Sequence, residues 1–321
     1  GISADDLPYI FDRYYRSRSD AGKQVTGLGL SITKAAEKLF ITQSALNQQL
    51  LKLERELGTP LFQRTKNKWC LTDAGRIYVE GARKMMQIKK DTYNQLYDVS
   101  LLRKGLLNIG LCPGRGLDMF TAIYPELHRS MPNLTIRPLE MRVAPQQAAI
   151  AAGDLDVGFQ VLSRSDWQKN QYEVLGSEEL IAIIPAVHPV AQKAAPPGEP
   201  LATLDLNEIR YEPFVLMDRN STLRSLCDQI FARSGFQPNV LFESNNTAGI
   251  VSLVKSTICC GIVPWYYTRI PSDELACFRL PGHPSWDITV SYPTTGYLST
   301  GAREFIRLAS EWWKTIQPDQ I

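Results

Sequence analysis

Two short runs of apolar residues recur at helical spacing near the beginning of the chain. They span residues 35–39 and 45–57, and only a few residues separate them. Thr42 suits the N-cap of the second run, and Gly58 suits its C-terminal cap. The pattern predicts a helix-turn-helix, a motif whose second helix presents its first side chains to the major groove of DNA.

The predicted second helix carries polar residues on the side away from its apolar stripe. Residues at positions i, i+1, i+4 and i+5 share one face of a helix, so their side chains can reach base edges together. Glutamine and asparagine side chains suit adenine in particular. The predicted DNA contacts on this helix are Thr42, Gln43, Ser44, Asn47, Gln48 and Lys52.

A short basic segment follows, between Pro60 and Gly75. Its pattern is consistent with a β-hairpin whose side chains contact phosphates, and such contacts fix register rather than specify sequence. The predicted contacts here are Arg64, Lys66, Asn67 and Lys68. Each residue alone fits an ordinary solvated surface, but the combination of helix, turn, polar face and basic hairpin favours DNA.

From Ala74 to about Leu102 the chain contains no proline, and its apolar positions form one narrow helical stripe. At 1.5 Å per residue this helix is roughly 40 Å long. A stripe on so long a helix needs a partner, which is either a second copy or the rest of the same chain. The stripe consists of Ile77, Gly81, Met85, Ile88, Thr92, Leu96 and Val99.

After Gly105 the pattern changes to short apolar strands that alternate with helices, which favours parallel sheets in α/β layers. The remaining length permits two lobes. The predicted strands are 106–111, 134–139, 155–161, 180–184 and 213–217. The predicted helices are 117–129, 145–152, 222–234, 247–256 and 301–314.

Composition indicates an ordinary globular chain of 321 residues, 44% hydrophobic and 21% charged. No apolar run reaches the roughly 18 residues of a membrane span, and no secretory signal opens the chain, so we expect a cytoplasmic protein without a membrane partner. Residues 34–105 hold fourteen Lys or Arg against seven Asp or Glu, whereas residues 106–321 hold seventeen against twenty-two. A basic module joined to an acidic one predicts a polyanionic partner for the first only.

Residues 34 to about 315 resemble LysR-type transcriptional regulators. The family's run AA..L..TQSA.S..I..LE..LG..LF.R......LT.AG is matched almost throughout; Asn47 replaces a common serine, and the hairpin is poor in arginine. The resemblance implies a winged helix-turn-helix at 34–75, a linker and dimerisation helix at 76–105, and a two-lobed, periplasmic-binding-protein-like α/β effector domain at 106–315, with its second lobe at about 181–280. The implied fold class is therefore mixed α and α/β.

The phrases LDVGF, IIPAVHP and GIVP support the effector-domain part of this resemblance. Open α/β sheets bind ligands beyond the carboxyl ends of their strands, against helix N-termini that favour anions, so we expect a small organic acid in the cleft. Ordinary capping and turn chemistry explains any one of these loops equally well. The predicted effector contacts are Cys112, Pro113, Gly114, Arg115, Gln160, Ser163, Asn220, Ser221, Thr222, Asn245, Asn246 and Thr247.

The resemblance implies double-stranded DNA and a small-molecule effector as partners, a homodimer or homotetramer, and RNA polymerase as a further partner. We expect no cofactor, metal or catalytic residue, because the three histidines lie far apart and Ser221 and Ser244 lack a nucleophile elbow. Adjacent Cys259 and Cys260 have apolar neighbours, which favours a structural role over redox sensing.

Residues 1–33 do not fit this family pattern. They resemble the end of a sensor histidine kinase ATP-binding domain, with Gly27–Leu30 similar to its GLGL box, but the other elements for ATP and magnesium are absent, so we expect no ATP binding. An apolar face formed by Leu7, Ile10, Phe11 and Tyr14 could replace the missing first helix of the head. The absence of an initiating Met suggests a fragment, a fusion or an error of gene calling.

Two other interpretations of the whole chain stay open at this point. One is a small-molecule binding protein whose defective head no longer binds DNA, which the salt dependence of duplex binding would distinguish. The other is a kinase-related signalling enzyme, which would bind or hydrolyse ATP.

Overall fold

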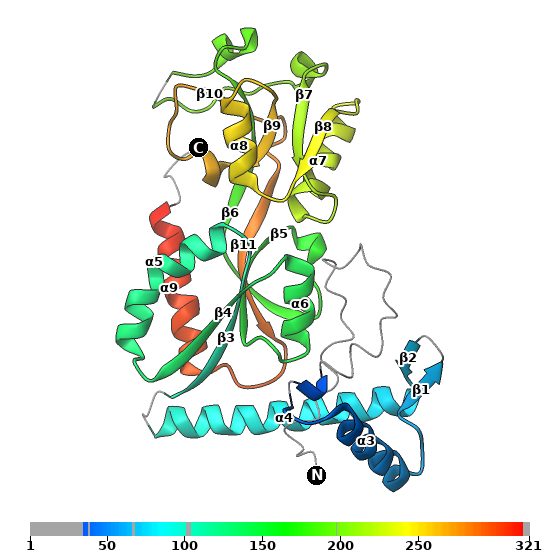
Figure 1. Cartoon of the computed structure of the whole chain (residues 1–321). Helices are drawn as coiled ribbons and strands as arrows, with labels where there is room; N and C mark the ends of the chain where they lie inside the picture. Colours follow the sequence, from blue (N-terminus) through cyan, green and yellow to red (C-terminus); the bar gives the residue numbers. More distant parts are fainter. Residues whose placement is uncertain (1–34, 38, 66–67, 101–103, 197, 317–321) are drawn as a thin grey trace. The chain divides into compact units, whose positions relative to one another are not determined.

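The computed structural model describes residues 35–37, 39–65, 68–100, 104–196 and 198–316. The predictions for residues 1–33 therefore lie outside the described residues. Contacts between residues divide the chain into two compact units, with the boundary between Gln95 and Leu96. Figure 1 shows the elements of both units. No helix in the described ranges is long and apolar enough to cross a membrane.

The smaller unit contains the predicted helix-turn-helix and hairpin. Residues 35–37 are helical, and the next helix follows after a short turn. Thr42 caps this helix as predicted, because its Oγ1 accepts a hydrogen bond from the Ala45 N–H at 3.1 Å, and Gly58 ends it in the left-handed region. The elements are α3 (Gln43–Leu57), the antiparallel strands β1 (Phe62–Thr65) and β2 (Lys68–Leu71), and α4 (Asp73–Val99), which extends past the unit boundary.

One carboxylate fixes the hairpin to α3. Oε1 of Glu54 accepts hydrogen bonds from the N–H groups of Leu61 at 2.8 Å and Phe62 at 3.1 Å. The side chains of Leu61 and Phe62 then pack with Leu50 and Val79 in a small core. The helix that carries the predicted base contacts is thus held rigidly to the hairpin.

The start of α4 depends on a close backbone approach at Gly75. Thr72 Oγ1 accepts from the Gly75 N–H at 2.9 Å and donates to the Pro60 carbonyl at 2.7 Å. A Cβ at Gly75 would lie 2.1 Å from the carbonyl oxygen of Leu61. No side chain fits there without moving the backbone.

We therefore expect Gly75→Ala to lower the free energy of unfolding of the smaller unit by about 1–3 kcal/mol, as overpacking does. Urea titration of the helical signal would measure the change. Glu80→Ala is the control, because Glu80 is exposed on the same helix and pairs with Lys84, so this substitution should change stability by less than about 0.5 kcal/mol. Equal effects of both substitutions would contradict the packing argument.

The predicted apolar stripe of α4 is exposed in the chain. Val79 and Ala82 are buried on another side of the helix. The large residues of the stripe each keep more than half of their surface exposed. The exposed members are Ile77, Met85, Ile88, Leu96 and Val99.

The larger unit is built on one continuous mixed sheet and a separate strand pair. The sheet order is β10-β6-β11-β5-β3-β4, with β9 also paired to β6, and β7 pairs in parallel with β8. The strands are β3 (Gly105–Leu111), β4 (Leu134–Glu140), β5 (Val157–Leu162), β6 (Asn170–Pro185), β7 (Pro213–Met217), β8 (Asn239–Ser244), β9 (Gly261–Pro264), β10 (Leu275–Arg279) and β11 (Ser285–Pro293).

The long strand β6 divides this unit into two lobes. Its first part pairs with β11, and its last part pairs with β9 and β10. The chain crosses between lobes at Leu180 and again between β10 and β11, and the Leu180 N–H donates to the Pro284 carbonyl at 2.8 Å. Lobe one contains β3, β4, β5, β11 and the start of β6; lobe two contains β7, β8, β9, β10 and the end of β6. This is the predicted two-lobed architecture.

Helices cover both lobes. In lobe one α5 and α9 lie on one side of the sheet and α6 on the other, whereas α7 and α8 belong to lobe two (Figure 1). The helices are α5 (Arg115–Ser130), α6 (Val143–Ala151), α7 (Thr222–Arg233), α8 (Thr247–Lys255) and α9 (Thr300–Ile316). Single 3-10 turns are η2 (Arg164–Asp166), η3 (Pro189–Lys193), η4 (Leu206–Ile209) and η5 (Trp265–Thr268).

The expectation of parallel sheets is correct only in part. Strand β3 is parallel to β4 and β5, and β7 is parallel to β8, but β6, β9, β10 and β11 all run antiparallel to their neighbours. The predicted strand at 180–184 is only the end of β6. The reason is the double crossing, because β11 returns to lobe one in the direction opposite to β6.

Candidate functional sites

The outer face of α3 is the first candidate site. Leu46 and Leu50 are buried on one side of the helix. The side chain of Lys52 is largely exposed and lies 3.8 Å from the Glu56 carboxylate. Most of the predicted base-contacting residues are exposed on the other side, namely Thr42, Gln43, Ser44 and Gln48.

Asn47 differs from its predicted partners. Its side chain is only partly exposed, and its Oδ1 is buried without a hydrogen-bond partner among the described residues. The exposed polar face of α3 is therefore narrower than the spacing predicts, because Asn47 turns one end of its amide toward the protein.

The structure describes the backbone of two of the four predicted phosphate contacts on the hairpin. Arg64 lies on β1 opposite Trp69, and Lys68 begins β2 opposite Thr65. Lys66 and Asn67 connect the two strands and lie outside the described residues. The backbone therefore places Arg64 and Lys68 close to the turn of one hairpin.

The second candidate site is a cavity of about 870 Å³ between the two lobes of the larger unit. It lies at the ends of strands that are followed by the helices α5, α6, α7 and α8. This volume suits a small organic ligand. Ten of the twelve predicted effector contacts line it: Cys112, Pro113, Gly114, Arg115, Asn220, Ser221, Thr222, Asn245, Asn246 and Thr247.

The other two predicted contacts do not line the cavity. Gln160 is fully buried in β5, and its Oε1 accepts a hydrogen bond from Ser291 Oγ at 3.0 Å. Ser163 is partly exposed at the start of η2. Both residues were predicted to contact the effector because they lie at the end of β5. The side chain of Gln160 instead points into the core, since successive side chains of a strand face opposite sides of the sheet.

Sequence reasoning missed the connection between β4 and α6. Glu140, Arg142 and Val143 line the cavity there. The rule that identified the loops after β3 and β7 applies equally to this loop, because β4 is parallel to β3. Other lining residues come from later segments and had no local signal: Gln147, Trp167, Met217, Tyr267 and Trp286.

Four helices begin at this cavity, and they differ in their caps. Ser221 caps α7 and Asn246 caps α8 through side-chain oxygens, which accept from the Arg224 and Gly249 N–H groups at 3.0 Å and 3.2 Å. Helices α5 and α6 begin at Gly114 and Arg142 without a side-chain cap. In α5 the first-turn N–H groups of Gly116 and Leu117 donate instead to the carbonyl oxygens of Cys112 at 3.1 Å and Gly114 at 2.9 Å.

Arg115 lines the cavity, but its guanidinium is paired with a buried carboxylate, while its Nε is buried without a hydrogen-bond partner among the described residues. Its guanidinium forms two hydrogen bonds with the Glu178 carboxylate, at 2.5 Å and 2.9 Å, and both side chains are at most 3% exposed. Burial alone would lower the pKa of Arg115, but the charge and hydrogen bonds of Glu178 outweigh burial and raise it. Arg115 is thus a charged structural group whose charge is already neutralised.

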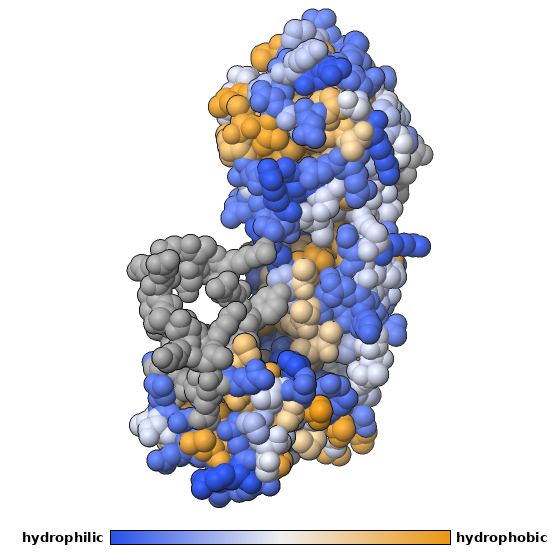
Figure 2. All heavy atoms as spheres, turned by 90° about the vertical axis from the view of Figure 1, so that its right-hand side faces the viewer, coloured by the Kyte–Doolittle hydropathy of each residue, from blue (hydrophilic) through white to orange (hydrophobic). Residues whose placement is uncertain are grey.

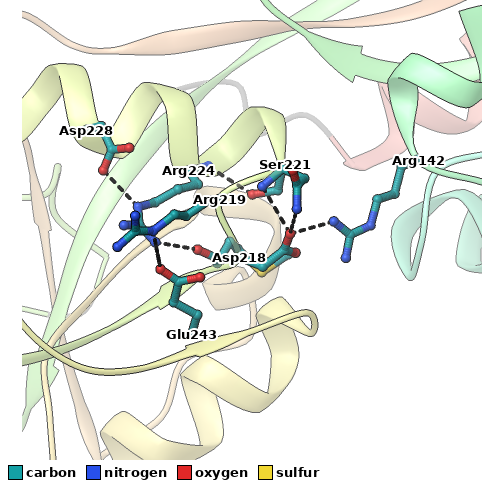
Figure 3. Close-up of polar contacts among 9 residues, drawn as sticks. Arg142, Asp218, Arg219, Ser221, Arg224, Asp228 and Glu243 are labelled. Atoms are coloured by element: carbon teal, nitrogen blue, oxygen red, sulfur yellow. Dashed lines mark hydrogen bonds and ion pairs between the residues drawn. The ribbon is translucent and has the colours of Figure 1, made fainter. Parts of the chain in front are cut away.

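Arg142 connects the two lobes. Its Nη1 lies 2.6 Å from Oδ1 of Asp218, which follows β7 in lobe two (Figure 3). Burial raises the pKa of the Asp218 carboxyl, but the hydrogen bond from Arg142, the Asn220 N–H and the charge of Arg142 outweigh burial and hold it below its usual value. Asp218 is therefore an ionised partner for Arg142.

A separate ion-pair network lies beside this contact within lobe two. Arg224 donates to Asp228 and Glu243, and Arg219 also donates to Glu243 (Figure 3). In the space-filling view, strongly hydrophilic side chains gather on lobe two below an area of hydrophobic ones (Figure 2). Among the described residues, the side-chain partners of Arg219 and Arg224 in this network come from lobe two.

Three buried cysteines of the larger unit, Cys112, Cys259 and Cys260, are protonated thiols. Burial raises the pKa of Cys112 to about 11 and that of Cys260 to about 12, and it also raises the pKa of Cys259. Since the thiolate is the reactive form, these environments favour the structural role predicted for Cys259 and Cys260. Cys70 is exposed.

We expect a thiol reagent at pH 8 to modify Cys70 at least about 100-fold faster than Cys112, Cys259 or Cys260, because burial suppresses both thiolate and access. Stopped-flow labelling with a disulfide reagent would show one fast phase that Cys70→Ser removes. Urea-unfolded protein, in which all six cysteines react, supplies the control amplitude. A fast phase that persists in Cys70→Ser and maps to Cys259 or Cys260 would contradict this expectation.

Comparisons with known families match both units. Residues 26–76 match the family described as bacterial regulatory helix-turn-helix protein, lysR family, and residues 102–314 match the LysR substrate binding domain. The chain is 29% identical over 256 residues to a probable RuBisCO transcriptional regulator of Cyanidioschyzon merolae. This match covers 78% of this chain and 80% of the relative. It is 25% identical over 286 residues to the Hca operon transcriptional activator HcaR of Escherichia coli, covering 88% and 93%.

Solved structures show the same fold. A full-length OxyR variant from Pseudomonas aeruginosa has a TM-score of 0.60 at 18% identity, and full-length BenM has 0.56 at 21% identity. Both comparisons cover 97% of this chain and 97% of the other. Because a helix-turn-helix, a two-lobed α/β domain and both family matches occur in one chain, the protein belongs to the LysR family of bacterial transcriptional regulators.

Proposed function

We propose that the exposed face of α3 contacts base edges in the major groove, and that the hairpin contacts the neighbouring phosphates. LysR-type regulators are DNA-binding proteins controlled by small molecules, rather than enzymes. The observation that carries the proposal is the exposure of Gln43, Ser44 and Gln48 on a helix whose other side is packed. Exposed glutamines at the start of such a helix suit adenine edges.

We further propose that the stripe of α4 pairs with its counterpart in a second copy. The exposure of Met85, Ile88 and Leu96 supports this pairing, because a narrow apolar stripe on a long helix buries itself against a similar one. Two copies would place two heads on the half-sites of a two-fold operator. Sedimentation would distinguish a dimer from a tetramer. A binding assay with RNA polymerase would test that further partner.

The cavity between the lobes is our proposed effector site, and an organic acid is the proposed effector class. The predicted contacts that line the cavity support this proposal. An effector that prefers one arrangement of the lobes would shift the equilibrium between states of the bound regulator, by no more than its difference in affinity for the two states. A regulator that binds operator DNA must lie in the same compartment as the chromosome, so we propose a cytoplasmic location.

Selection of bound duplexes from a random pool tests the DNA proposal. Wild-type protein should enrich one sequence with two related half-sites, and Gln43→Ala should relax preference at defined positions of each half-site, by about 1–3 kcal/mol per lost bidentate contact. Glu56→Ala, at the far end of the same helix, is the control and should keep the preference. Enrichment of no sequence by folded protein would contradict the proposal.

For residues 1–33 we propose that the apolar face of Leu7, Ile10 and Phe11 replaces the first helix of the head. The family match that begins at residue 26 leaves these three residues outside it. The likeness of this segment to a histidine kinase ATP-binding domain is a proposal from sequence, and we expect no ATP binding. Because the family match begins at residue 26, removal of residues 1–25 should weaken duplex binding or head stability, and unchanged binding would count against the replacement.

A further inference from the structure

We propose that Arg142 binds the carboxylate of the effector, and that this carboxylate takes the place of Asp218 as the partner of Arg142. The inference rests on the proposed function of the cavity and adds the chemistry of recognition to it. In this proposal Arg142 binds the ligand, and the ion pair that Arg142 forms with Asp218 between the lobes is lost when the ligand binds.

The positive charges around the cavity lead to Arg142. Among the described residues that line the cavity, the basic ones are Arg115 and Arg142. Glu178 holds Arg115 through two hydrogen bonds in a buried site, and removing such a partner would leave an uncompensated buried charge. Arg142 is different, because its side chain is 42% exposed and, among the described residues, it forms an ion pair with Asp218. An acid in this cavity therefore has one cation available to it.

The present partner of Arg142 is itself a carboxylate. Oδ1 of Asp218 lies 2.6 Å from Nη1 of Arg142, so the structure already shows the geometry that a ligand carboxylate would adopt. Val143 and Ala144, in the first turn of α6, also line the cavity, and α6 lacks a side-chain cap. An anion that replaces Asp218 at Arg142 would thus also face the amino end of this helix.

Asp218 can release Arg142 without losing all of its hydrogen bonds. The Asn220 N–H donates to Oδ1 at 3.1 Å, and the Asp218 N–H is held by the Ser244 carbonyl at 2.8 Å. Oδ2 of Asp218 is buried without a hydrogen-bond partner among the described residues. The carboxylate is therefore fixed in lobe two, and exchange moves the arginine rather than the aspartate.

The exchange would alter the contact between the lobes. Arg142 precedes α6 in lobe one, and Asp218 follows β7 in lobe two, so this ion pair bridges the cavity at a point remote in sequence from both crossings. A ligand that occupies Arg142 removes this bridge and supplies its own contacts to lobe two. Binding and the arrangement of the lobes are then coupled through one side chain.

The remaining charges define the ligand class further. Asp118, Glu140 and Asp166 line the same cavity. These carboxylates disfavour a second negative charge on the ligand. Apolar and aromatic surface is supplied by Trp167, Met217 and Tyr267. The cavity thus fits a monocarboxylate with an apolar body better than a dicarboxylate or a phosphate.

The test compares a carboxylate with its uncharged amide in the full-length protein. The probes are cyclohexanecarboxylate and cyclohexanecarboxamide, titrated at constant ionic strength while tryptophan fluorescence is recorded, since Trp167 and Trp286 line the cavity. The variants are Asp218→Asn, Arg142→Gln and the double variant. The controls are Arg219→Gln and Asp228→Asn, which change the same charges within lobe two but leave the bridge intact.

We expect Asp218→Asn to bind the carboxylate about tenfold more tightly than wild type, because the competing carboxylate is gone. Arg142→Gln and the double variant should lose this binding, the controls should match wild type, and the amide should not distinguish the variants. Unchanged or weaker carboxylate binding in Asp218→Asn, or equal binding in Arg142→Gln, overturns the exchange. Duplex binding measured on the same samples separates the two proposals, since it persists when only the exchange is wrong.

Discussion

Replacing Glu178 with alanine is expected to lower the free energy of unfolding of the larger unit by about 3–5 kcal/mol. The Glu178 carboxylate accepts two hydrogen bonds from Arg115, one from the Tyr266 N–H at 2.6 Å and one from Trp286 Nε1 at 2.9 Å. Removing it leaves a buried guanidinium without a counter-charge and two further donors without an acceptor. Urea unfolding followed by tryptophan fluorescence would measure the loss.

A matched exposed pair provides the control for Glu178. Glu126 pairs with Arg129 on the surface of α5, so Glu126→Ala should change stability by less than about 1 kcal/mol. Replacing both Arg115 and Glu178 by methionine should restore much of the loss, because no buried charge remains. A loss below about 1 kcal/mol in Glu178→Ala would show that water or movement compensates Arg115, contrary to the buried geometry.

Placing a charge in the α4 stripe should have the second large effect. We expect Ile88→Asp to convert the assembly to a smaller one and to weaken operator binding by about 10²–10⁴-fold, because two linked heads gain that factor over one. Ile88 is exposed in the chain, so the substitution should not disturb the fold of a single copy. Sedimentation and duplex titration on the same samples would measure both changes.

Asn94→Asp is the control for the stripe. It introduces the same charge away from the stripe, since residues 88 and 94 are about 120° apart around the axis of a helix. This variant should keep the assembly and the operator affinity of wild type. An Ile88→Asp protein that keeps both would show that α4 does not mediate pairing.

Features that depend on neighbouring residues could be predicted from the sequence. Thr42 and Gly58 delimit α3 because caps act within one turn, and the hairpin follows from its turn and basic residues. The loops after β3, β7 and β8 were identified as cavity residues because parallel strands end at the same edge. The same rule, applied to β4, would have found Arg142.

Features that depend on distant residues could not be predicted. Arg142 and Asp218 are 76 positions apart, and Arg115 and Glu178 are 63 apart. No local pattern shows that one arginine meets a buried carboxylate while the other bridges two lobes. The double crossing through β6 was likewise hidden, since its middle is not a uniformly apolar run. Arg115 therefore looked like an anion-binding residue, and the structure shows that Glu178 already holds it.

The most direct test of the central claim is the affinity of the wild-type protein for its selected duplex between 50 and 200 mM salt. If Arg64, Lys66 and Lys68 of two heads each neutralise a phosphate, six contacts predict a loss of about 10³-fold over this range. That steep fall, together with loss of sequence preference in Gln43→Ala, is the predicted result. Folded protein that binds no duplex at 50 mM salt, or binds with the same affinity at 200 mM, would contradict the claim that α3 and the hairpin form a DNA-reading head.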